Sequence, residues 1–309
     1  MAGRSPSWKS TEPSASTGAD QAEFSAMKGI ASVLDTAISD EIISGEIDDE
    51  IDLLSQPEYP AWQEQDLALE ELVGEAAREI NRRIEILGKD VYPFEFSNNK
   101  IRYKGSKSGF YEFCLATCIA DDIKTNPFTA LPRTFERATA LLLRSYFGKG
   151  SRALHTGWPR KPHQAFRNVM EKLKQEDAEW IWRPQDGQDD NDIKDETLDF
   201  VVTVSPIDSR AGNLYALGQC ACGNDWNTKL KEPDLKRIGK WFHPPWIIPP
   251  IKVFTTPHVI GAKTMREVAN ESEALVFDRL RLTLVSETRL PTSQQRHGRR
   301  RLDAIRSIV

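Results

Sequence analysis

The chain has 309 residues, which is room for one large domain or two smaller ones, and its 39% hydrophobic content is typical of globular proteins. Its net charge of −5 gives no global attraction to nucleic acid, and no run approaches the ~18 apolar residues that a transmembrane helix needs. The N-terminal residues also lack the apolar core of a signal peptide, so the four cysteines are expected to be reduced, in a cytoplasmic protein without a membrane partner.

The N-terminal part predicts a tail and then a mainly helical region. Residues 1–22 are rich in Ser, Thr, Pro, Ala and Gly and predict a disordered tail. Residues 23–130 predict helices with one small hairpin. The clearest helix there is Gln63–Leu87, because its apolar residues recur at helical spacing and Gly88 follows as a stop. The hairpin is expected at 91–104, with a turn of Ser and Asn.

Residues 131–290 are predicted to form an α/β core, followed by a basic C-terminal tail at 291–309. Turn residues separate two β-rich runs, which therefore predict a hairpin. The strand–helix–strand order after the hairpin fits a mixed sheet with helices on both sides. The predicted elements are a helix at Leu131–Phe147, strands at Leu198–Val204 and Leu214–Ala221, a short helix at Pro233–Phe242, a strand at Ile251–Thr256 and a helix at Met265–Val276.

Two polar residues of the predicted hairpin mark where one strand begins and the other ends. Asp199 lies at the start of the first strand, and Gln219 lies near the end of the second. In antiparallel neighbours these two positions meet at one end of the sheet. Carboxylate and amide oxygens suit a hard cation such as Mg²⁺.

These residues resemble the motif of the PD-(D/E)xK nuclease superfamily, which combines a helical acid, a hairpin Asp and then Glu or Gln-x-Lys. Asp199 matches the hairpin acid, Gln219-Cys220-Ala221 the last element, and Glu136 the helical acid. The resemblance covers roughly Pro132 to Leu230. It implies an α/β fold with a restriction-endonuclease-like mixed sheet flanked by helices and a helical N-terminal extension. It also implies an endonuclease that uses Mg²⁺ or Mn²⁺.

The resemblance further implies roles and partners. Asp199 would bridge the metal, Glu136 would support the metal or orient water, and Gln219 would contribute its amide oxygen. Nucleic acid is the implied partner, DNA in preference to RNA, together with a protein partner or a second copy. Bacterial restriction or anti-phage defence is the implied setting. Basic segments surround the motif, as expected near phosphates: Arg133–Arg144, Lys149–Lys161, Lys229–Lys240 and Arg299–Arg301.

The family lysine is missing, because Ala221 occupies its position. Three explanations remain open. Lys229, ten residues beyond Gln219, takes over its role; the chain binds nucleic acid without cutting it; or Ala221 replaces a natural lysine in this copy.

A non-catalytic reading also accounts for each residue. Asp199 would then cap a strand, Gln219 would bond the sheet end, and Glu136 would be an exposed helix charge three residues from Arg133. The chain would be a non-catalytic nucleic-acid-binding or protein-interaction subunit of a defence complex. A zinc site is a further alternative, although buried cysteines acting as small hydrophobic residues are favoured; its four sulfurs would come from Cys114, Cys118, Cys220 and Cys222.

Overall fold

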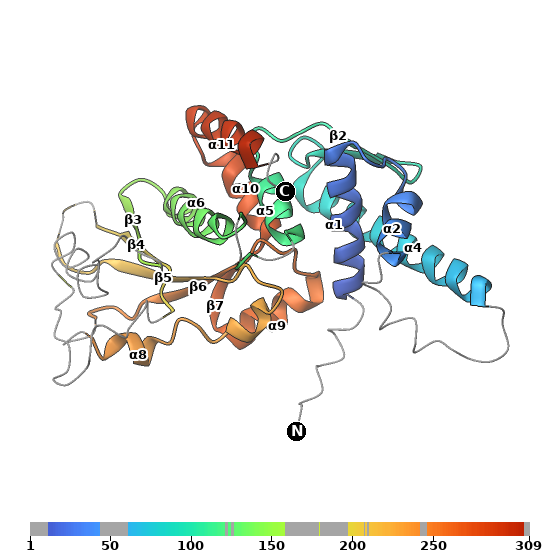
Figure 1. Cartoon of the computed structure of the whole chain (residues 1–309). Coiled ribbons are helices and arrows are strands. Elements are labelled where there is room, and N and C mark those ends of the chain that lie inside the picture. The colour runs from blue at the N-terminus through green and yellow to red at the C-terminus, as the bar shows by residue number, and fades with distance from the viewer. Residues whose placement is uncertain are drawn as a thin grey trace, which may run out of the picture. The chain divides into compact units, whose positions relative to one another are not determined.

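The structure is a computed structural model, and its contacts divide the chain into two compact units (Figure 1). The first unit comprises Met1–Ile119 with Arg296–Ser307, and the second comprises Ala120–Gln295. The residues that the structure describes are 12–43, 61–120, 123–124, 127–157, 179, 197–206, 208, 210–241 and 246–305.

The first unit is helical apart from one small hairpin. Its elements are α1 (Glu12–Lys28), α2 (Leu34–Ile43), α4 (Ala61–Leu87), β1 (Phe94–Ser97), β2 (Lys100–Tyr103), α5 (Phe110–Ile119) and most of α11 (Thr292–Ile305). Helix α4 and the hairpin confirm the sequence prediction. Gly88 follows α4 with φ +79°, and Asn98 and Asn99 form the turn with positive φ angles, which asparagine tolerates better than most residues.

A buried ion network joins helices α1 and α4. The Arg83 side chain is fully buried, and its Nη1 donates to Asp20 Oδ1 at 2.6 Å and to Glu23 Oε1 at 3.0 Å. Its Nε donates to Glu79 Oε1 at 2.9 Å. Because a buried guanidinium requires partners, this network holds α1 against α4. The predicted disorder of residues 1–22 is therefore wrong from Glu12 onward, where the chain is helical.

The second unit is built on a five-stranded mixed sheet in the order β3-β4-β5-β6-β7. Strands β3, β4 and β5 are antiparallel neighbours, whereas β5, β6 and β7 run parallel. Its elements are α6 (Ala130–Phe147), β3 (Ser151–His155), β4 (Phe200–Val204), β5 (Leu214–Cys220), η2 (Trp226–Lys229), α8 (Leu235–Gly239), β6 (Ile251–Thr255), α9 (Ala262–Ser272), β7 (Ala274–Phe277) and α10 (Arg279–Thr288).

Helices cover both faces of this sheet (Figure 1). Leu217 packs in a cluster with residues of α8, and Ala221 packs with residues of α9, so these two helices share a face. On the other face the Phe277 ring meets Tyr146 of α6, with ring centroids 5.0 Å apart. The mixed α/β class and the β4–β5 hairpin confirm the sequence prediction.

Close packing dictates one glycine at the centre of the hairpin. A Cβ on Gly218 would lie 2.0 Å from the Phe200 ring, which stacks over the glycine on the neighbouring strand. Gly218 therefore lets Phe200, the first residue of β4, pack directly on β5. This contact fixes the position of Phe200 at the start of β4, and Asp199 is the residue directly before it.

Three segments differ from the prediction. Strand β3 was not predicted, and the end of the predicted Met265–Val276 helix is strand β7, because Glu273 adopts φ +51° and ends α9. The predicted basic tail forms helix α11, where Arg299 Nη1 binds the buried Glu112 carboxylate at 2.7 Å. The sequence also predicts a helix at His163–Gln175 and a strand at Trp180–Arg183, and both segments lie outside the described residues. No helix in the described part of the chain is long and apolar enough to cross a membrane.

We expect Arg83→Met to destabilise the first unit by about 3–5 kcal/mol, because Glu23 and Asp20 would remain buried without their counter-charge. Urea unfolding followed by circular dichroism measures this free energy. Arg102→Met is the control, since the Arg102–Glu95 ion pair lies on the surface and its loss should leave the unfolding midpoint nearly unchanged. Equal midpoints for Arg83→Met and the unaltered chain would contradict this reading of the network.

Candidate active site

Asp199 is held firmly at the point where three strands meet. Its main-chain carbonyl accepts hydrogen bonds from the N–H groups of Thr156 and Gly157 at 2.8 and 3.0 Å, just beyond strand β3. Its main-chain N–H donates to the Gly218 carbonyl on β5 at 2.9 Å. The carboxylate is buried, and its Oδ2 accepts the N–H of Cys220 at 2.7 Å. The backbone of both neighbouring strands thus positions this acid.

A second network fixes the residues that precede Asp199. Thr197 Oγ1 donates to Glu232 Oε2 at 2.5 Å and accepts from Arg237 Nη2 at 2.8 Å. Arg237 Nη2 also binds Glu232 Oε2 at 2.9 Å. These three side chains link the entry to β4 with helix α8, so the chain reaches Asp199 along a defined path.

Glu136 faces Asp199 across Gly157. Glu136 lies on helix α6 and is only 9% exposed. A Cβ placed on Gly157 would lie 2.6 Å from Glu136 Oε2 and 3.1 Å from Asp199 Oδ1. Both carboxylates therefore border the same small space, and a side chain at position 157 would intrude on it. The alternative that Glu136 is an exposed helix charge is wrong.

His155 is a neighbour that the sequence did not reveal. It ends strand β3, and its Nε2 lies 2.7 Å from Glu136 Oε2. The interleaved basic and aromatic residues of 155–163 predict a loop, yet His155 belongs to strand β3. The run Ser151–His155 does not alternate between apolar and polar residues, so the sequence carries no local signal for this strand.

The backbone of Cys220 links Gln219 to Asp199, since the side chains of both residues form hydrogen bonds with it. Strand alternation places Gln219 on the face of Leu217 and Ala221, opposite helix α6. Its Nε2 donates to the Cys220 carbonyl at 3.2 Å, while its Oε1 is buried and has no hydrogen-bond partner among the described residues. Because a buried amide oxygen without a partner is costly, this atom is a candidate cation ligand.

The two other predicted site residues are Ala221 and Lys229. Ala221 is fully buried in an apolar cluster with Phe254, Val268 and Val276. The position where the motif has a lysine therefore carries no positively charged side chain. Lys229 lies at the end of η2, partly exposed, and its side chain forms no ion pair or hydrogen bond with any described residue. The structure therefore brings Glu136 and Asp199 together beside Gly157, and it links Asp199 and Gln219 to the backbone of Cys220; it does not pair Lys229 with them.

Cys220 experiences the negative charge of this site. Burial, followed by the charges of Asp199 and Glu136, raises the pKa of the Cys220 thiol well above its usual range. Its sulfur accepts a hydrogen bond from Thr255 Oγ1 at 3.1 Å. The thiol therefore stays protonated at neutral pH.

The donor set at this site is made of oxygens. In the described part of the chain no three His, Cys, Asp or Glu residues gather closely enough to hold a metal ion, and the four-cysteine zinc alternative gains no support there. None of the four cysteines forms a disulfide. A cation beside Glu136 and Asp199 would need additional oxygens, and the buried Gln219 Oε1, which has no partner among the described residues, is the candidate that the motif offers. Such a set fits a hard divalent cation.

Comparisons with known proteins add little to this geometry. No protein-family profile matches the chain, and no curated protein matches its sequence. A solved structure of the MspJI restriction endonuclease in complex with a 27-mer oligonucleotide aligns with a TM-score of 0.30 and 13% identity. The alignment covers 62% of this chain and 36% of that chain. A TM-score of this size does not establish a shared fold.

We expect Gly157→Ala to separate the two carboxylates, because its methyl group would overlap Glu136 Oε2. Overpacking of this kind typically costs about 1–3 kcal/mol, measurable as a lower unfolding midpoint in urea. Gly74→Ala on α4 is the matched control, since the nearest described atom, Arg78 Nη1, lies 3.6 Å away and leaves room for a methyl group. A Gly157→Ala protein as stable as the unaltered chain would show that the carboxylates do not crowd position 157 as described.

Proposed function

We propose that the chain is a metal-dependent nuclease with a restriction-endonuclease-like core in its second unit. The observation that carries the proposal is the meeting of two buried carboxylates, Glu136 and Asp199, beside Gly157. Structural carboxylates are usually solvated or paired with a cation, whereas acids that converge from a helix and a strand end are typical of cation-binding sites. The motif resemblance of Glu136, Asp199 and Gln219 supplies the reaction class.

The residues present would hold Mg²⁺ or Mn²⁺ through oxygens of Asp199, Glu136 and Gln219. When bound, such an ion would activate a water and neutralise the charge that develops on a phosphodiester. Other residues of the chain would hold the two carboxylates in position. Asp199 is fixed by main-chain hydrogen bonds on both sides, and His155 holds the Glu136 carboxylate in place. Burial keeps the pair away from bulk water.

Nucleic acid is the proposed substrate, with DNA favoured over RNA, and the same resemblance proposes bacterial restriction or anti-phage defence as its setting. Basic side chains near the site would bind the phosphates of the substrate. Arg133 and Arg137 lie on α6 within one turn of Glu136, and Lys229 lies beyond strand β5. Such cations position a nucleic-acid backbone without reading its sequence.

One observation favours a second candidate function, in which the chain binds nucleic acid without cutting it. Ala221 lies inside an apolar cluster, and no ion pair joins Lys229 to the carboxylates among the described residues. The charge that the family lysine would supply in the transition state is thus missing. The chain would then be a binding subunit that works with a protein partner or a second copy.

Plasmid cleavage in Mg²⁺ or Mn²⁺ tests the proposal with the unaltered chain, Ala221→Lys and Asp199→Asn. We expect cleavage by the unaltered chain or by Ala221→Lys, and no cleavage in EDTA. Asp199→Asn, introduced into whichever protein cuts, should lower the rate by at least about a hundredfold, because the site loses a charged oxygen ligand.

Asp208→Asn serves as the matched control, since Asp208 is an exposed acid in the link between β4 and β5 that pairs with Arg210. It should cut like its parent protein. If only Ala221→Lys cuts, the unaltered chain is the binding form. If no protein cuts and none retards the plasmid in a gel, both functions are refuted.

A further inference from the structure

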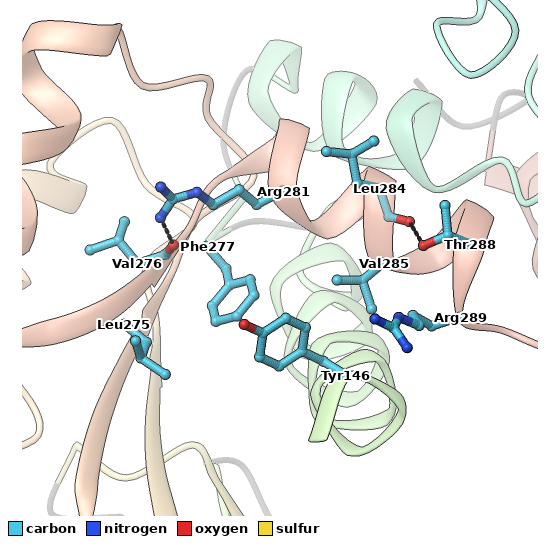
Figure 2. Close-up of a pocket in the computed structure, with 9 residues that line it drawn as sticks. All are labelled: Tyr146, Leu275, Val276, Phe277, Arg281, Leu284, Val285, Thr288 and Arg289. Carbon is cyan, nitrogen blue, oxygen red and sulfur yellow. Dashed lines mark hydrogen bonds between the residues drawn. The ribbon is translucent and has the colours of Figure 1, made fainter. Parts of the chain in front are cut away.

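A pocket of about 350 Å³ lies in the second unit, lined by strand β7, helix α10 and the last turns of α6 (Figure 2). It shares no residue with the carboxylate site. Its volume falls at the lower end of the range of small-molecule sites, which suits a ligand the size of a mononucleotide.

One wall of the pocket is apolar and open to solvent. Tyr146 and Leu275 are 44% and 43% exposed, although large apolar side chains are usually covered. The Tyr146 ring meets Phe277 edge-on, with an interplanar angle of 81°, and Figure 2 shows Leu275 on the same side of the pocket. An aromatic ring held by edge contact keeps a face available for stacking. This wall suits a flat, apolar group.

The charged side chains of the pocket are all cationic. Of the nine described residues that line it, two are arginines and none is acidic. Arg281 and Arg289 lie eight residues apart on α10 and its C-cap, about 12 Å along the helix axis, so the pocket has a guanidinium towards each end.

The two arginines are not equally engaged. Arg281 Nη1 donates to the Val276 carbonyl at 2.7 Å, which fixes its guanidinium at the rim. The Arg289 side chain is exposed and forms no hydrogen bond or ion pair with any described residue. An exposed arginine beside an apolar wall is well placed to bind an anionic group of a ligand by a bidentate contact.

We propose that this pocket binds a nucleotide unit. The base packs on the wall of Tyr146, Leu275 and Phe277, and the phosphate pairs with Arg289. Arg281, which is held by the Val276 carbonyl, bounds the opposite end of the pocket. An apolar ring joined to an anion matches both parts of the lining, whereas inorganic phosphate matches only one. The unit is either a free nucleotide or part of a nucleic-acid chain. The proposal does not rest on the nuclease function, because none of its residues belongs to the carboxylate site.

Isothermal titration in EDTA tests the proposal with the full chain, so that no divalent cation contributes. The probes are AMP, GMP, CMP and UMP, inorganic phosphate, and a single-stranded 10-mer of mixed sequence. We expect at least one mononucleotide or the 10-mer to bind, and phosphate alone to bind at least about tenfold more weakly. Binding of mononucleotides indicates a free nucleotide as the ligand, and binding of the 10-mer alone indicates a unit within a chain.

Variants locate the binding. Arg289→Ala and Tyr146→Ala should each weaken it by about tenfold or more, and Tyr146→Phe should retain it. Arg266→Ala, an exposed arginine on α9 outside the pocket, should bind like the unaltered chain. Unchanged thermal midpoints confirm that the variants are folded. The proposal is overturned if no probe binds, if phosphate binds as tightly as every nucleotide, or if Arg289→Ala binds as well as Arg266→Ala.

Discussion

Two acidic side chains, Glu136 and Asp199, are buried next to each other where β3, β4 and β5 come together. Like charges at close range repel, and burial removes the water that would screen them, so such a pair persists only if the surrounding structure holds it. The second unit provides that support. The extension of β3 binds the Asp199 carbonyl, and Cys220 donates to its carboxylate. Gly157 leaves the space that both acids border.

The support extends away from the carboxylates into the packing of the sheet. Gly218 admits the Phe200 ring, which sets the position of the residue that follows Asp199. The Thr197, Glu232 and Arg237 network sets the residue two positions before it. Catalytic sites require side chains whose positions are fixed by the surrounding residues in this way. The raised pKa of the Cys220 thiol reflects both its burial and the negative charge gathered there.

Sequence reasoning reached the parts of this site that are close in the chain. Asp199 and Gln219 were placed together because a hairpin fixes its own register locally, and both side chains do contact the backbone of Cys220. His155 and Gly157 were missed because β3 pairs with β4 across more than forty intervening residues, and no local pattern encodes that pairing. For the same reason the sequence predicts a tail where helix α11 forms, since Arg299 finds Glu112 only in the folded chain, 187 positions away in sequence. The burial of Ala221 depends on α9, which follows it by some forty residues.

We propose that Glu136 and Asp199 form one divalent-cation site, and crystals of the full chain soaked in Mn²⁺ would reveal such a site by anomalous scattering. We expect an anomalous peak within coordination distance of Asp199 and Glu136 oxygens, with the Gln219 Oε1 or the Cys220 carbonyl as a further ligand. The same peak should vanish in Asp199→Asn crystals. Empty density between the two carboxylates at saturating Mn²⁺, with both side chains in the positions described, would contradict it.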